Sequence, residues 1–234
     1  MRMAIAESCD TYYYDLAHRM GIDTMADVLE PFGLGRPTGV DTTAEQGGIL
    51  PNTRWKREAM GEAWFPGETL SAGIGQGYML ATPMQLAQAT MVLANRGTSF
   101  VPSIVHRVGD MTVGGVPREP LKMHEEDWRA VIEGMVDVVH GQRGTAASIS
   151  KGITYQMAAK TGTSQVIGIA QDAIYEEDKV SERNRNHGLF IAFAPETKPR
   201  IVVVVLAENG GGSSAATPVA RRVIDAWLNE LSDV

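Results

Sequence analysis

The stretch MAAKTGTSQV, residues 157–166, places one lysine and two threonines around a glycine in a run of small and apolar residues. Its length and composition predict a strand, and two more segments of strand composition follow it, HGLFIAFAP at 187–195 and RIVVVVLAE at 200–208. Because the run 202–205 shows no polar alternation, we expect it to be buried on both faces. The sequence therefore predicts an antiparallel sheet of three strands in the second half of the chain.

Helical patterns precede and follow these strands. Thr82, Pro83 and Gln85 carry the residues of a capping box, which predicts a helix to about Asn95, and Asp10 is expected to cap an earlier helix. The last helix is expected to cover one face of the sheet with an apolar stripe made of Val219, Val223, Trp227 and Leu231. The predicted fold class is α+β, with residues 1–150 mainly helical with loops and residues 151–234 holding the strands and the C-terminal helix.

Composition limits the possible functions. The chain has 234 residues, 44% of them hydrophobic and 21% charged, which is typical of a globular protein with a sizeable core. A net charge of −7 and the lack of a lysine or arginine cluster argue against binding to nucleic acid. The single cysteine, Cys9, excludes an internal disulfide, and no stretch approaches the ~18 apolar residues that a membrane span needs.

The K-T-G-T segment has the chemistry of a site that binds a carboxylate. Lys160 supplies positive charge, Thr161 and Thr163 supply hydroxyls, and the Thr163 N–H can face a developing oxyanion. Gly162 would let a ligand backbone lie close to the strand. The alternative is an edge lysine that only protects the strand from pairing. An S-x-D tripeptide in the helical region, residues 8–10, favours the site, because this pair of motifs is typical of penicillin-binding proteins and class A β-lactamases.

Further segments make the similarity more specific. Together with GIGQGYMLATPMQLAQA, FGLGRPTGVD, FIAFAP and ENGGG, the two motifs resemble the transpeptidase domain of class B penicillin-binding proteins of the elongation type, over nearly the whole chain. The resemblance implies the C-terminal part of a penicillin-binding-protein/β-lactamase-like fold. The first strands of the sheet, the helix with the nucleophile and the membrane anchor are then expected upstream of this sequence, which leaves one edge of the strand at 201–206 open.

The activity that this resemblance implies is peptidoglycan D,D-transpeptidation during cell elongation. A serine attacks the D-Ala-D-Ala end of a stem peptide, releases D-alanine and passes the acyl group to an amine on a neighbouring strand, and β-lactams mimic that peptide. Lys160, Thr161 and Thr163 would hold the terminal carboxylate, and Ser8 would relay a proton toward the leaving nitrogen. We expect Ser8 Oγ within about 5 Å of the Lys160 ammonium. Asp10 stands where the family more often has asparagine, and an ionised carboxylate cannot donate, so its expected role is orientation.

The nucleophile motif of the family, S-x-x-K, should precede residues 8–10 by tens of residues. The match in this chain, Ser148-Ile149-Ser150-Lys151, comes after them, so we interpret it as a loop between helix and strand. The sequence is therefore expected to hold the S-x-D and K-T-G motifs without the acylating serine, and to be inactive alone.

A thiol at Cys9, between Ser8 and Asp10, could pack inertly, react or bind a metal. A lone cysteine is ordinarily a small buried hydrophobic residue, and no histidine or second cysteine lies at ligand spacing from it. The resemblance adds a structural zinc site that uses Cys9, with aspartate and histidine ligands upstream of this sequence. The chemistry itself is expected to need no cofactor.

The resemblance also implies partners and a location. These are peptidoglycan stem peptides, β-lactam antibiotics and membrane proteins of cell elongation, at the periplasmic face of the bacterial inner membrane. Two other functions stay open at this point. One is a penicilloyl-serine sensor or hydrolase of the same superfamily, although no glutamate stands in an obvious position to activate water. The other is a non-catalytic scaffold of the elongation machinery that uses the loop 33–55.

Overall fold

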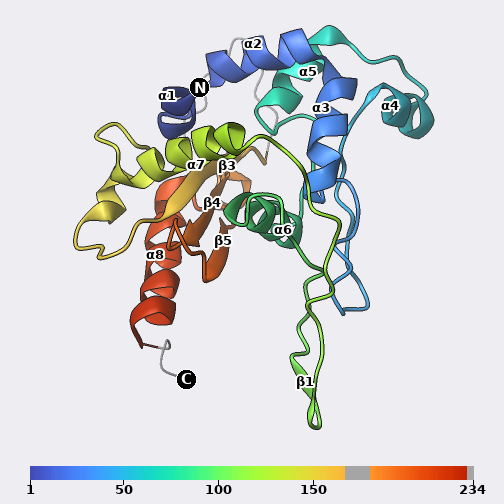
Figure 1. The fold of residues 1–234 in the computed structure, drawn as a ribbon. Helices are drawn as coiled ribbons and strands as arrows, with labels where there is room; N and C mark the ends of the chain where they lie inside the picture. The colour runs from blue at the N-terminus through green and yellow to red at the C-terminus, as the bar shows by residue number, and fades with distance from the viewer. Residues whose placement is uncertain (167–179, 231–234) are drawn as a thin grey trace. The chain divides into compact units, whose positions relative to one another are not determined.

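The computed structural model describes residues 1–166 and 180–230 of the chain, with helices and a small antiparallel sheet (Figure 1). The chain divides into two compact units. The helical unit is Cys9–Trp128, and the sheet unit combines Met1–Ser8 with Arg129–Val234. Helix α7 (Glu125–His140) crosses the boundary between the units. The units do not coincide with the division at residue 150 that the element types suggested, because the first eight residues and most of α7 belong with the strands.

The helical unit is built from short helices and one small hairpin. Its elements are α2 (Asp10–Met20), α3 (Ile22–Leu29), η1 (Glu30–Phe32), α4 (Thr53–Met60), α5 (Pro66–Gly73), α6 (Pro83–Ala94), β1 (Arg107–Val108) and β2 (Met111–Thr112). Helix α2 packs on α5, where a Cβ at Gly73 would come within 2.5 Å of Ala17 Cβ. The glycine therefore allows the close approach of these two helices.

The predicted capping box at the start of α6 is confirmed. The Thr82 hydroxyl accepts from the Gln85 N–H at 3.1 Å, and Gln85 Oε1 accepts from the Thr82 N–H at 2.8 Å. The buried Gln85 amide also donates to the carbonyl oxygens of Arg36 and Gly47, at 2.8 and 2.6 Å. One side chain therefore both caps the helix and holds the long loop that precedes α4.

The prediction that Asp10 caps a helix is wrong by one residue. Helix α2 begins at Asp10 itself, and Cys9 occupies the cap position with extended backbone and no side-chain cap hydrogen bond. The chain turns at Ser8, whose φ of 53° lies in the left-handed region, and this turn brings Asp10 into the first helical turn. A carboxylate there still interacts favourably with the helix dipole.

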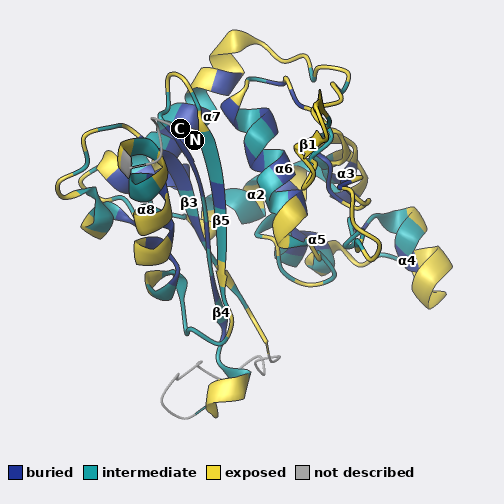
Figure 2. Ribbon diagram, turned by 90° about the horizontal axis from the view of Figure 1, so that it is seen from below, coloured by how far each residue is buried: buried dark blue, intermediate teal, exposed yellow. Residues whose placement is uncertain are grey.

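The sheet unit confirms the three predicted antiparallel strands. Its elements are α1 (Arg2–Ala6), most of α7, η2 (Ala147–Ser150), β3 (Ala158–Ser164), η4 (Glu182–Asn184), β4 (His187–Ala194), β5 (Ile201–Ala207), η5 (Ser213–Ala215), α8 (Thr217–Asp225) and η6 (Ala226–Glu230). The strand order is β3-β4-β5, with Lys160 opposite Ile191 and Gly162 opposite Leu189. Phe190 and Phe193 of β4 are fully buried and form part of the core of this unit. Figure 2 colours the backbone by burial and shows buried positions in dark blue within this sheet.

Strand β5 differs from the expectation of burial on both faces. Val203 is buried, whereas Val202, Val204 and Val205 are only partly buried and Leu206 is exposed. Within the described residues β5 pairs with β4 alone, so it lies at an edge of the sheet, and the predicted open edge is present. The edge position explains the incomplete burial of this apolar strand.

The predicted apolar stripe of the last helix is also wrong. Helix α8 packs on β4 and β5, and the side chains of Ala216 at its cap, Ala220 and Ile224 are all 0% exposed. The expected stripe faces away, and its described members are 50%, 44% and 43% exposed at Val219, Val223 and Trp227, while Leu231 lies outside the described residues. Alanine side chains let the helix axis come close to the sheet, which bulkier residues would prevent.

Candidate active site

Ser8 of the S-x-D motif and Lys160 of the K-T-G-T segment meet in the sheet unit, as predicted. Lys160 Nζ on β3 donates to Ser8 Oγ at 2.8 Å and to the carbonyl oxygen of Thr161 at 2.9 Å. The distance from Ser8 Oγ lies well within the expected limit of about 5 Å. An ammonium at hydrogen-bond distance from a serine hydroxyl can assist proton transfer at that oxygen.

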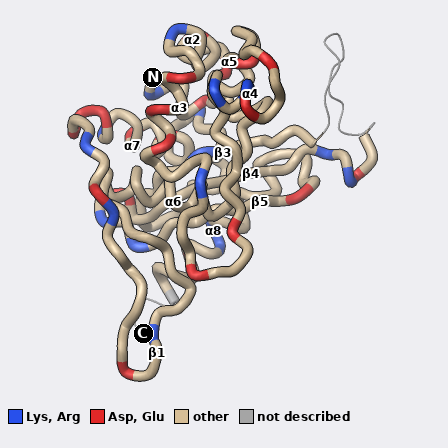
Figure 3. The backbone as a smooth tube through the Cα atoms, turned by 90° about the vertical axis from the view of Figure 1, so that its right-hand side faces the viewer, with Lys and Arg blue, Asp and Glu red and all other residues tan. Residues whose placement is uncertain are grey.

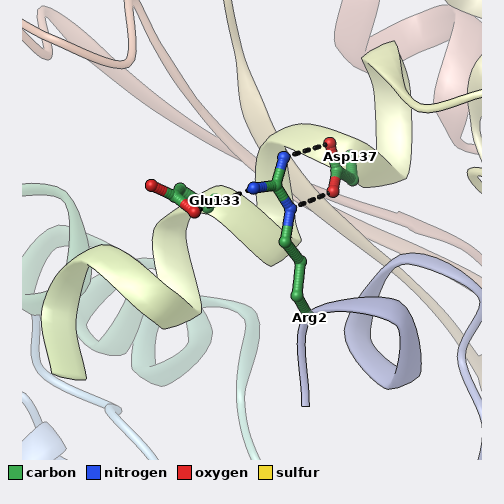
Figure 4. A network of polar contacts seen from close by, with 3 residues as sticks. All are labelled: Arg2, Glu133 and Asp137. Atoms are coloured by element: carbon green, nitrogen blue, oxygen red, sulfur yellow. Dashed lines mark hydrogen bonds and ion pairs between the residues drawn. The ribbon is translucent and has the colours of Figure 1, made fainter. Parts of the chain in front are cut away.

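Ser8 follows helix α1, which is fixed on α7 by a charged network (Figure 4). The Arg2 guanidinium donates to both carboxylate oxygens of Asp137, with Nη2 3.0 Å from Oδ1, and its Nη1 lies 2.9 Å from Glu133 Oε2. The hydrogen bond from Arg2 lowers the pKa of the Asp137 carboxyl below its ordinary value. The network therefore joins the first turn of α1 to α7.

Close packing adds to this placement of α1. A Cβ at Gly134 would lie 2.8 Å from Ile5 Cδ1, so the glycine lets α1 lie directly on α7. Arg143 forms an ion pair with Glu7 at 2.9 Å, one residue before Ser8. The backbone that carries Ser8 is thus held from both ends of α1.

Strand β3 is joined to the end of α7 by a backbone contact. The Met157 N–H donates to His140 Nε2 at 3.2 Å, immediately before the strand begins. Burial lowers the pKa of the His140 imidazole below its ordinary value, which favours the neutral ring that this contact requires. One helix therefore positions both the segment with Ser8 and the strand with Lys160.

The two threonines of the K-T-G-T segment lie in different surroundings. Thr161 is buried, and its hydroxyl is 2.8 Å from the hydroxyl of Thr145. Thr163, in contrast, is exposed. Sequence reasoning missed Thr145, because a Gly-Thr pair after a helix has no motif that marks it, and only the fold brings it to Thr161.

Gly162 has a structural reason to be glycine. A Cβ at this position would lie 3.1 Å from Leu189 Cβ on the neighbouring strand β4. This contact is tighter than ordinary van der Waals distance, so strand packing favours glycine here. The close approach of a ligand backbone to Gly162 stays a prediction.

The out-of-order S-x-x-K match has structural contacts of its own. Ser150 Oγ donates to the Ala147 carbonyl at 2.8 Å within η2. Arg221 of α8 donates to the carbonyl oxygens of Ile149 and Lys151, at 2.6 and 3.3 Å. The segment is a short 3₁₀ turn anchored on α8, in agreement with its interpretation as a connection between helix and strand.

Cys9 is exposed, so the expectation of a buried small hydrophobic residue is wrong. Its sulfur lies 3.2 Å from Thr11 Oγ1, and this hydrogen bond lowers the pKa of the thiol below its ordinary value. Within residues 1–166 and 180–230, no three or more histidine, cysteine, aspartate or glutamate side chains form a cluster that could hold a metal ion. The zinc expectation therefore has one candidate ligand here, Cys9.

Basic and acidic residues are interspersed along the chain, as Figure 3 shows for the backbone tube. Among the helices of the described residues, none has the length and apolar character to cross a membrane.

The chain is similar over most of its length to known proteins. The family described as penicillin binding protein transpeptidase domain matches residues 1–225. The peptidoglycan D,D-transpeptidase MrdA of Acinetobacter baumannii is 44% identical over 233 residues, which are 97% of this chain and 34% of that protein. The crystal structure of Pseudomonas aeruginosa PBP2 in complex with WCK 5153 has a TM-score of 0.86 at 40% identity, and the match covers 98% of this chain and 49% of that one.

A second solved structure is also similar. The complex between PBP2 and MreC from Helicobacter pylori gives a TM-score of 0.83 at 30% identity, covering 100% of this chain and 40% of that one. The chain spans about a third of the length of the curated relatives that it matches, at 34% and 36% for two of them.

Proposed function

This chain belongs to the penicillin-binding protein transpeptidase domain family, and we propose on that basis that it forms part of the catalytic domain of a peptidoglycan D,D-transpeptidase of cell elongation. The observation that carries the proposal is the 2.8 Å contact between Lys160 Nζ and Ser8 Oγ. It joins Ser8 of the S-x-D motif to Lys160 of the K-T-G motif, two residues that lie far apart in the sequence, within the sheet unit. Such a pair of motifs supplies the groups that bind a peptide carboxylate and move a proton.

In the proposed mechanism the acylating serine and its lysine come from a segment outside this sequence. The terminal carboxylate of the stem peptide is bound by Lys160 and the Thr163 hydroxyl. The carbonyl oxygen of the reacting bond accepts a hydrogen bond from the Thr163 N–H. The serine–carbonyl bond forms as the bond to D-alanine breaks, and Ser8 passes the serine proton to the leaving nitrogen. An acceptor amine then attacks the ester. The new amide bond forms as the bond to the serine oxygen breaks, and the proton lost by the amine goes to that oxygen.

The proposed partners follow from this reaction. They are peptidoglycan stem peptides as substrates, β-lactams as inhibitors and membrane proteins of cell elongation, at the periplasmic face of the inner membrane. The similarity to a PBP2 that was solved with MreC supports the last class of partner. Asp10, the first residue of α2, is proposed to orient groups at the site.

The proposed function predicts where penicillin attaches. A fluorescent penicillin should label the full-length protein at a serine outside this sequence, because the chain offers no S-x-x-K in the required order. The 234-residue chain alone should stay unlabelled. Peptide mapping of the label locates the serine, and a covalent adduct on Ser148 would contradict the proposed arrangement.

We also propose Cys9 as one ligand of a structural zinc ion whose other ligands lie outside this sequence. The exposed thiol with a lowered pKa supports this, since the thiolate is the form that binds metal. In the full-length protein, Cys9→Ser should lower the bound zinc measured by elemental analysis, and removal of zinc should raise the rate at which a maleimide labels Cys9. Unchanged zinc content in the serine variant would contradict the proposal.

A further inference from the structure

Thr145 makes two hydrogen bonds toward the proposed site from a position just after α7. Its backbone N–H donates to the Ala6 carbonyl at 3.1 Å, two residues before Ser8. Its hydroxyl lies 2.8 Å from the hydroxyl of Thr161, the residue next to Lys160. Thr145 therefore joins the end of α1 to strand β3 by a route that does not pass through Lys160.

The turn that carries Thr145 is itself fixed. A Cβ at Gly144 would lie 2.3 Å from the carbonyl oxygens of both Asp137 and Val138, so only glycine fits there. The Ala146 N–H donates to the Val138 carbonyl at 2.9 Å, and Ala146 is buried. The backbone position of Thr145 is thus set by the last turn of α7, the helix that also holds α1.

Two series of contacts connect the segment that ends in Ser8 to strand β3. One route runs from Ser8 through Lys160 to Thr161, and the other runs from Thr161 through Thr145 to Ala6. Ser8 has a φ of 53°, a conformation that a residue with a side chain adopts only when its surroundings hold it there. The second route supplies such a restraint, because it fixes the chain immediately before Ser8 against the strand that carries Lys160.

We propose that Thr145 is a positioning residue of the transpeptidation site, which holds the Ser8 segment and the K-T-G-T strand in register through its hydroxyl and its backbone N–H. The inference rests on the proposed function, since it gives Thr145 a role in the acylation that Ser8 and Lys160 assist. Thr145 is not assigned contact with the reacting atoms. Its effect is exerted through Thr161 and Ser8.

The test is the substitution Thr145→Val in the full-length protein, which removes the hydroxyl and keeps both the shape and the backbone N–H. Thr145 itself is exposed, but its partner Thr161 is buried. The rate constant of acylation by a fluorescent penicillin should fall about tenfold, the size expected when the hydroxyl of the buried Thr161 loses its hydrogen-bond partner. The dissociation constant of the non-covalent complex should change less than about twofold, because the groups proposed to bind the ligand carboxylate, Lys160 and Thr163, are unchanged. Thr145→Ser should restore the acylation rate constant, and thermal melts should show that every variant is folded.

Two controls separate positioning from general damage. Thr154→Val makes the same change at an exposed threonine of the sheet unit and should leave acylation unchanged. In a Thr161→Val background, Thr145→Val should add less than about a twofold loss, because the shared hydrogen bond is already gone.

Three results would overturn the inference: wild-type acylation in Thr145→Val, a serine variant as slow as the valine variant, or independent losses in the double variant. Lys160→Ala distinguishes this failure from failure of the proposed function. If acylation survives Lys160→Ala as well, the proposed function is wrong. If only Thr145→Val leaves acylation intact, the positioning role alone is wrong.

Discussion

Lys160→Ala in the full-length protein is expected to lower the rate of D-alanine release by about 10² to 10⁴-fold, the range that a positioned proton-transfer group contributes. The substitution removes both the charge that would bind the substrate carboxylate and the donor that lies 2.8 Å from Ser8 Oγ. The thermal melt should show a folded protein, because β3 keeps its backbone pairing with β4. Release of D-alanine from a pentapeptide substrate is the measurement.

Lys151→Ala is the matched control for this prediction. Lys151 is an exposed lysine of the same unit, and only its backbone carbonyl takes part in the contact with Arg221. D-alanine release should stay at the wild-type rate in this variant. If Lys160→Ala kept more than about a tenth of the wild-type rate, the K-T-G-T lysine would not act in catalysis, and the scaffold interpretation would gain support.

The meeting of Ser8 and Lys160 was predictable from sequence because it depends on motif chemistry. Two groups that act on one small ligand must lie within hydrogen-bond reach, whatever fold carries them. The three strands and the helix from Pro83 were predictable for a local reason, since composition and capping residues lie within the elements themselves. Each of these predictions used information contained in a short segment or in a chemical requirement.

The role proposed for Thr145 could not be predicted from the local sequence. Its role depends on where α7 ends and on the turn at Gly144, and neither is marked by a residue type that points to β3. Arg2 is similar, because its ion pairs with Glu133 and Asp137 join segments that are more than 130 positions apart. Contacts of this kind follow from the packed fold, so a single sequence does not predict them.

The face of the last helix could not be predicted for a different reason. Val219, Val223 and Trp227 repeat at helical spacing, but Ala216, Ala220 and Ile224 repeat at the same spacing on another face. Hydropathy favours the first set. The fold buries the second set, in which the small side chains of Ala216 and Ala220 allow the helix to approach the sheet closely. Periodicity alone does not distinguish the two.

Neighbouring residues of α8 allow this correction to be tested directly. Ile224→Ala should lower the free energy of unfolding by about 2 to 5 kcal/mol, because it removes a fully buried side chain and leaves a cavity against the sheet. Val223→Ala, at a side chain that is 44% exposed, should change it by less than about 0.5 kcal/mol. Urea denaturation of the two variants and the wild type, followed by circular dichroism, measures both values. If Val223→Ala were the more damaging substitution, the helix would present its valine stripe to the sheet, and the packing of α8 through alanines and Ile224 would be wrong.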